Sequence, residues 1–96
     1  MAQNIFLQEG IIQIEDLTFN ERAFVSLAYQ LNANDPQYYK RAYYAKYMNI
    51  DERSISRYII TCVQKGYLKA QYNGNEGIML TPTEKTIQLY KECEIF

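Results

Sequence analysis

The chain has 96 residues, which suits one domain and leaves no room for two, so we expect a single domain over residues 1–96. Hydrophobic residues make up 48% of it, which supports a folded core and argues against disorder. No apolar run approaches the roughly 20 residues that a membrane-spanning helix needs. Residues 1–7 lack the basic start of a secretory signal, so we expect a soluble, cytoplasmic protein.

The sequence also argues against an enzyme and against a metal site. It contains no histidine, which is the commonest general base and the commonest metal ligand. Cys62 and Cys93 stand far apart in helical patterns, where free cysteines behave as small apolar residues. No nucleophile-elbow or phosphate-loop glycine pattern is present. We therefore expect neither catalysis nor a cofactor.

The net charge of −1 is unevenly distributed. Residues 40–69 carry seven basic and two acidic side chains, a net +5, whereas the rest of the chain has a net −6. One face that meets a polyanion would explain this distribution, and a solvated helix surface would explain it equally well. The basic side chains are Lys40, Arg41, Lys46, Arg53, Arg57, Lys65 and Lys69.

An N-terminal extension covers residues 1–17 and is apolar on both sides of Gly10, which suggests a short strand and a helical turn. Thr18 and Glu21 have the spacing of a capping box, in which each side chain satisfies a backbone N–H at a helix start. Apolar residues then recur at helical spacing, so the first helix is predicted to end near Ala33.

Two more helices are expected after it. Asp35 and Pro36 suit the N-cap and the first helical position, which predicts a second helix to about Met48. The third helix is predicted to start near Asp51 and to stop at Gly66, where glycine can take the left-handed cap conformation.

The three helices fill residues 18–68. Strand-like runs on both sides of the turn residues 73–77 predict a hairpin over residues 69–80. Thr81 to Glu84 have the pattern of a second capping box, so a C-terminal helix is expected over residues 81–96. This order predicts a mainly α fold with a small β-hairpin.

Residues 44–68 carry the most informative pattern. Ala45 is small enough for a second helix to cross closely, and Ile50 would plug the turn between the helices. Asn49 stands where the chain must turn sharply, and asparagine is the non-glycine residue best suited to positive φ. Two helices joined by such a turn hold the second one at a fixed angle to the first.

This pattern resembles the helix-turn-helix of winged-helix DNA-binding proteins, a group that includes MarR-type regulators and plasmid or phage replication and partition proteins. The resemblance covers roughly residues 18–91 and implies a winged helix-turn-helix that binds double-stranded DNA, with the hairpin as the wing. Asn49 departs from the usual turn glycine, and the wing tip lacks the arginine that often enters a minor groove. The matching residues are Ala45, Met48, Ile50, Ile55, Arg57, Ile59, Gly66, Tyr67 and Leu68.

Polar side chains on the outer face of the third helix are the kind that read base edges in a major groove. Ser54 could equally cap its own helix. Lys40, Arg41 and Lys46 are expected to touch phosphates or nothing, and the wing is expected to add little affinity. The predicted DNA-binding residues are Arg53, Ser54, Ser56, Arg57 and Thr61, with Lys40, Arg41, Lys46, Lys65, Lys69, Asn73 and Asn75.

Tyr39, Tyr43 and Tyr47 recur every four residues. We expect this stripe to pack against the first helix or the N-terminal segment. Hydrogen bonds from phenols to phosphates are the functional alternative.

A homodimer is expected because a small DNA reader gains specificity from two half-sites related by two-fold symmetry. The two ends of the chain carry more apolar surface than one small core needs. The predicted interface residues are Ile5, Phe6, Leu7, Ile87, Tyr90 and Phe96.

Within DNA binding, two main roles stay open, a transcriptional regulator and a partition adaptor, with replication initiation as a third variant. The layout is also similar to TubR-type centromere-binding proteins, which implies cooperative binding to repeated sites and a tubulin-like GTPase partner. A winged helix used for protein–protein contact is the alternative class, favoured by the acidic balance and the poorly basic wing.

Overall fold

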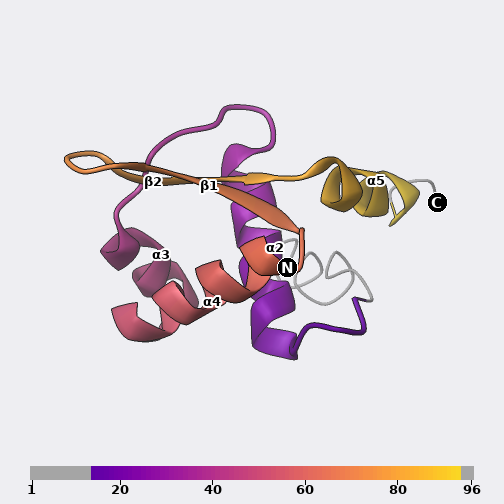
Figure 1. Ribbon diagram of the computed structural model, residues 1–96, viewed down its shortest axis with the longest axis horizontal. Coiled ribbons are helices and arrows are strands. Elements are labelled where there is room, and N and C mark those ends of the chain that lie inside the picture. Colours follow the sequence, from indigo (N-terminus) through magenta and orange to yellow (C-terminus); the bar gives the residue numbers. More distant parts are fainter. Residues whose placement is uncertain (1–13, 94–96) are drawn as a thin grey trace, which may run out of the picture.

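The computed structural model describes residues 14–93. Figure 1 shows α3 and α4 on one side of the hairpin, α2 crossing it, and α5 at the end opposite the hairpin turn. The strand and turn expected before residue 14 lie outside the described residues. The elements are α2 (Phe19–Asn32), α3 (Arg41–Met48), α4 (Glu52–Gln64), β1 (Leu68–Asn73), β2 (Gly77–Pro82) and α5 (Glu84–Cys93). No helix within residues 14–93 has the length and apolar character needed to cross a membrane.

The capping box at the start of α2 is confirmed. Thr18 Oγ1 accepts from the Glu21 backbone N–H at 3.2 Å, and Glu21 Oε1 accepts from the Thr18 N–H at 2.9 Å. The helix ends at Asn32 with Ala33 as its C-cap, as the apolar spacing predicted. Its buried side presents Phe24 and neighbouring apolar residues to the core.

The predicted start of the second helix is wrong. The residues just before Arg41 are not helical, and α3 begins only at Arg41. Tyr39 instead forms an antiparallel bridge to Ile78 of β2, with N···O distances of 3.0 and 2.8 Å in the two directions. The loop therefore lies beside β2 and pairs with it through one bridge, as a very short third strand would.

Tertiary hydrogen bonds explain why the local helix signal failed. Asn32 is buried at the end of α2, and its Oδ1 accepts from the Gln37 backbone N–H at 2.9 Å. The Asn32 Nδ2 donates to the Leu80 carbonyl at 2.7 Å, which ties the loop to β2. The Asp35 carboxylate accepts from the Gln37 side chain at 2.9 Å, in place of the backbone N–H that a cap would use.

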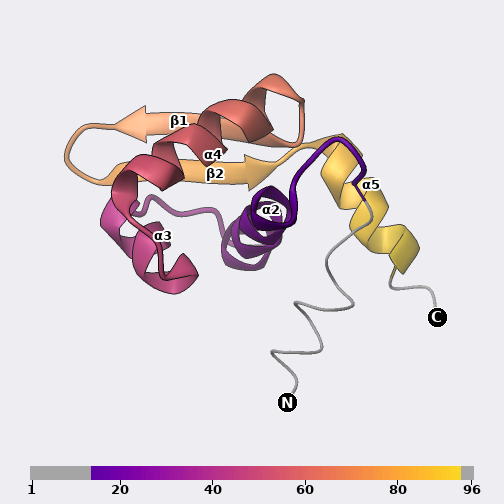
Figure 2. The same ribbon diagram turned by 90° about the horizontal axis from the view of Figure 1, so that it is seen from below.

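The helix-turn-helix has the predicted turn. Asn49 caps α3 in the left-handed conformation, with φ 58° and ψ 46°. Asp51 is the N-cap of α4, where its carboxylate accepts from the Ser54 N–H at 2.9 Å. The helix stops just before Gly66, whose φ is +86°. Figure 2 shows α4 lying across the two strands, so the turn fixes this helix against the hairpin.

The predicted second capping box is wrong by two residues. The hairpin runs in register from Leu68 opposite Pro82 to Asn73 opposite Gly77, so β2 continues through Pro82. The residue that caps α5 is Thr83, whose Oγ1 lies 3.5 Å from the Thr86 N and donates to the Gly66 carbonyl at 2.7 Å. Thr81 and Pro82, which the sequence pattern assigned to the start of the helix, thus belong to strand β2.

Tyr44 fills the centre of the core. Its side chain is fully buried, its ring meets Phe24 edge-on at 6.0 Å, and its hydroxyl donates to the Ile78 carbonyl at 2.8 Å. Burial raises the pKa of Tyr44 to about 12. The helices, the turn between α3 and α4, and the hairpin together form a winged helix-turn-helix, which confirms the predicted fold class.

Candidate nucleic-acid interface

The face of α4 that points away from the core carries a row of exposed residues. The helix buries Ile55, Ile59 and Cys62 on its inner side. Residues spaced by four, three and four positions lie on one face of a helix, here the opposite one. We call these exposed residues the outer row: Arg53, Arg57, Ile60 and Gln64.

The start of α4 is organised by its own side chains. The Ser54 backbone N–H holds the pKa of the Asp51 carboxyl below its usual range, and the nearby Arg53 adds to this effect. The Ser54 hydroxyl, half-buried, accepts from Arg57 Nη2 at 3.2 Å. The cap of α4 is therefore Asp51 and not Ser54, whose side chain instead contacts Arg57.

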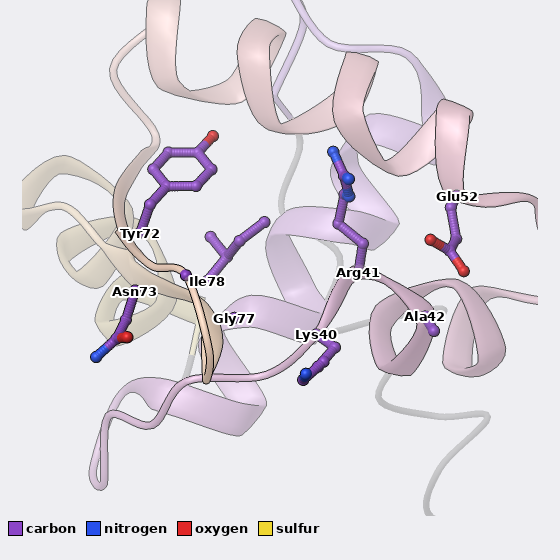
Figure 3. Close-up of a pocket in the computed structure, with 9 residues that line it drawn as sticks. Lys40, Arg41, Ala42, Glu52, Tyr72, Asn73, Gly77 and Ile78 are labelled. Carbon is purple, nitrogen blue, oxygen red and sulfur yellow. The ribbon is translucent and has the colours of Figure 1, made fainter.

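Arg41 connects the first turn of α3 to α4. Its Nη1 donates to the Ser56 Oγ at 3.1 Å. Figure 3 shows the Arg41 side chain reaching toward α4, between Tyr72 of the hairpin and Glu52. Ser56 is half-buried and lies to the side of the outer row, so its hydroxyl faces Arg41.

A groove of about 350 Å³ lies where the starts of α3 and α4 meet the hairpin. No side chain caps α3, because its N-cap residue is Lys40 and that side chain makes no capping hydrogen bond. The N–H groups of an uncapped first turn and two basic side chains favour an anion there, whereas Glu52 opposes it. The groove is lined by Lys40, Arg41, Ala42, Glu52, Tyr72, Asn73, Gly74, Gly77 and Ile78.

Lys65 lies far from this groove. It is twelve residues beyond Arg53, or about 18 Å along the helix axis. Its ammonium donates to the Asp16 carbonyl, and its own carbonyl accepts from Lys85 Nζ at 3.1 Å. Lys65 thus fastens the N-terminal turn to the end of α4.

The other predicted contact residues differ in exposure and lie on several elements. Thr61 is half-buried on α4. Lys46 is exposed on α3, and Lys69 is exposed on β1 opposite Thr81. The wing-tip residues Asn73 and Asn75 are exposed.

The tyrosine stripe packs mostly on itself. Tyr39 and Tyr43 stack with centroids 4.5 Å apart, and Tyr43 meets Tyr47 at 5.2 Å. Tyr47 is 56% exposed and borders a surface hollow of about 240 Å³ that also contacts Phe19 of α2. Tyr39 and Tyr43 also meet the buried Tyr44 edge-on, with centroids 5.8 and 6.4 Å apart, so the stripe contacts the core as well as itself.

Two features of this surface were missed in the sequence analysis. Ile60 belongs to the outer row, and its position seven residues after Arg53 was the available signal. Tyr72, which is 68% exposed on β1, borders the groove. Tyr72 lies near α3 because Tyr39, just before that helix, pairs with Ile78 of β2. No local sequence pattern predicts this pairing.

Tyr90, predicted at a dimer interface, belongs to the core of the protomer. Its side chain is 3% exposed, its hydroxyl bonds to the Ser26 hydroxyl, and its ring stacks on Tyr29 at 3.9 Å. Ile87 is half-buried on α5. The other predicted interface residues, Ile5, Phe6, Leu7 and Phe96, lie outside the described residues.

An outward-facing helix held by a tight turn beside a β-hairpin defines a winged helix-turn-helix. No family model matches the chain, and no curated protein sequence matches it. Solved structures do share its fold, and those named below are MarR-type proteins. The predicted resemblance to MarR-type winged helices is therefore confirmed at the level of fold.

The oxidized form of MarR from E. coli superposes with a TM-score of 0.64 at 15% identity, covering 96% of this chain and 63% of that one. The adhesin competence repressor AdcR from Streptococcus pyogenes gives 0.62 at 18% identity, covering 96% and 64%. A double mutant of ZitR from Lactococcus lactis gives 0.62 at 18% identity, covering 95% and 63%. The chain thus spans just under two thirds of the length of these proteins.

Proposed function

We propose that this chain is a transcriptional regulator, not an enzyme, that binds specific sites in double-stranded DNA as a homodimer in the cytoplasm. The observation that carries the proposal is the outer row of α4, which presents Arg53 and Arg57 on one exposed face beside the basic groove. Proteins with the same fold include named repressors, which supports a regulator over the other DNA-binding roles.

Base reading is assigned to the outer row. A helix of this kind enters the major groove, where an arginine can bind guanine O6 and N7 with two hydrogen bonds. Arg57 is held by Ser54 before any DNA arrives, which reduces the side-chain entropy lost on binding. Arg53, one turn nearer the helix start, is exposed and available to the adjacent base or phosphate.

Phosphate contact is assigned to the groove. Lys40 and Arg41 stand at the uncapped start of α3, where positive charge and backbone N–H groups act together. Asn73 borders the same groove and can donate a hydrogen bond to a phosphate oxygen. Such contacts position the protein on the duplex without reading sequence.

The proposal includes a homodimer because each copy of the chain has one helix that can read DNA. One copy offers a single recognition helix, and a two-fold pair would read two half-sites about one helical turn apart. We assign the contact to Ile87 of α5 with Ile5, Phe6, Leu7 and Phe96, since Tyr90 is taken up by the core. Light scattering at micromolar concentration tests this, and a monomeric mass would refute it.

The deciding experiment selects duplexes from a random library with the full chain and measures their affinity across a salt series. Affinity should fall as salt rises, because phosphate contacts release counterions. Arg57→Ala should weaken binding by roughly 1–3 kcal/mol and relax the choice of base at one position. Lys91→Ala removes one positive charge from an exposed position on α5, outside the outer row and the groove, and should change little.

Outcomes of that experiment separate the roles. In a gel-shift assay, a single shifted species on each selected duplex supports the role of a regulator. Ladders on repeated sites would favour the partition role with a tubulin-like GTPase partner. Absence of binding to any duplex at low salt would overturn DNA binding and leave the protein-interaction role.

A further inference from the structure

Ile60 is a large apolar side chain in the middle of an otherwise polar row. It is 55% exposed, between Arg57 and Gln64 on the outward face of α4. Ile60 does not contribute to the core, because α4 packs through its opposite face. Isoleucine is also a weaker helix former than alanine, so helix stability does not explain its place.

The surroundings of Ile60 point to its partner. Arg57 lies one turn before it, and the hydrogen bond to Ser54 draws that guanidinium toward the helix start, away from Ile60. The apolar side chain is therefore presented beside a positive charge but not covered by it. A ligand that fits this surface is a polyanion with an apolar group on it.

We propose that Ile60 is a specificity-determining residue that reads thymine through its C5-methyl group. This inference rests on the proposed function, which places the outer row in the major groove. The thymine methyl is the apolar group that base edges present there. With Arg57 one turn away, the pair would favour a guanine and a thymine at neighbouring positions of each half-site.

A second copy of the chain fits the same surface less well. Two outer rows facing each other would bring Arg53 and Arg57 near their own counterparts, and like charges repel at such distances. A phosphate-flanked groove instead offers charges of the opposite sign. Charge complementarity therefore selects DNA as the occupant.

Val63 supplies a matched control on the same helix. It is also a branched apolar residue and is 37% exposed, but it lies to the side of the outer row, on the flank that carries Ser56. Truncating Val63 removes a comparable apolar surface without touching the outward face.

The test uses the full chain and duplexes recovered from a random library by its own binding. Each thymine of the recovered site is replaced in turn by deoxyuridine, which lacks only the methyl group. At least one replacement per half-site should weaken binding about fourfold, the value of one buried methyl. Ile60→Ala should bind both versions of that site equally, whereas Val63→Ala and Ile60→Val should retain most of the difference.

Several results would overturn the proposal. The wild-type chain could bind deoxyuridine sites as well as thymine sites, which leaves DNA binding intact but removes the methyl contact. Ile60→Ala could keep the full thymine preference. It could also lower the mass in light scattering while keeping that preference, which would assign Ile60 to a protein contact. Failure to recover any duplex would overturn the proposed function as well.

Discussion

Arg41 donates a hydrogen bond to Ser56 across the helix-turn-helix, with 3.1 Å between Nη1 and Oγ. The bond joins the first turn of α3 to the first half of α4, the two segments that flank the groove. A serine that looked like a base reader in the sequence is thus the acceptor that holds an arginine in place.

Removing either Arg41 or Ser56 should weaken DNA binding, because both changes impair the phosphate contact of Arg41. Arg41→Ala loses a phosphate contact, and Ser56→Ala leaves the guanidinium without its anchor, so we expect the second effect to be the smaller. The double variant should bind about as weakly as Arg41→Ala alone, because Ser56 acts only through Arg41. Anisotropy on selected and unrelated duplexes checks this, and both variants should weaken the two duplexes equally.

Additive losses in the double variant would contradict this assignment. So would a change of base preference in Ser56→Ala, which would return that serine to direct reading.

Gly77 is the position where the hairpin demands glycine. Its φ is +113°, and a Cβ there would overlap the Tyr39 carbonyl and lie 2.8 Å from Lys40 N. Both atoms belong to the backbone that pairs with Ile78, so neither can yield cheaply. Gly77→Ala should cost about 1–3 kcal/mol of unfolding free energy, since strain at positive φ adds to the overlap.

Gly74 provides the control in the same turn. A Cβ at Gly74 meets nothing within 4 Å. Gly74→Ala should therefore unfold in urea near the wild-type midpoint, whereas Gly77→Ala should unfold earlier with a similar slope. Equal midpoints for the two variants would show that the approach of Tyr39 to the hairpin is not maintained in solution.

The buried hydroxyl of Tyr44 makes the fold sensitive to alkali. Burial raises its pKa to about 12, above the ordinary value near 10, so the folded state keeps a proton that the unfolded state releases. This stabilisation is complete below pH 10 and is lost as pH rises from about 10 to about 12. Urea unfolding across that range should show a falling midpoint.

Tyr44→Phe separates the two contributions of that hydroxyl. At pH 8 the variant should be about 1 kcal/mol less stable, since it loses the hydrogen bond to the Ile78 carbonyl. Its midpoint should then fall less steeply above pH 10 than that of the wild type, because phenylalanine does not titrate. Tyr72→Phe, at an exposed position, should match the wild type at pH 8.

The parts of the fold that were predictable from sequence are those fixed by local chemistry. The Thr18 capping box, the left-handed Asn49 and the Asp51 cap depend on hydrogen bonds or sterics within a few residues. A sequence displays such interactions directly, since the interacting groups lie three or four positions apart.

The errors arose where distant segments compete with local signals. Asp35 and Pro36 resemble a helix start, but the chain there is held by Asn32 and by the pairing of Tyr39 with β2. The partner of Tyr39 is 39 residues away, so no local pattern could reveal it.

The candidate surface follows the same division. Arg53 and Arg57 could be assigned from helical spacing alone, because the inner face of α4 was legible as an apolar stripe. The sequence could not show which polar side chains are engaged in hydrogen bonds within the fold. Arg41 bonds to Ser56, 15 positions away, and Lys65 bonds to Asp16, 49 positions away.

Cys62 should be chemically silent in the folded protein. Its side chain is fully buried in α4, and burial raises the pKa of the thiol to about 12, so almost no thiolate exists near pH 8. In a Cys93→Ser variant, which leaves Cys62 as the single thiol, Ellman's reagent at pH 8 should react at the rate of unfolding. Addition of urea above the midpoint should release one thiol per chain within seconds. Rapid reaction without denaturant would mean that α4 separates from α2 in the native state, and the rigid placement of the outer row would then have to be abandoned.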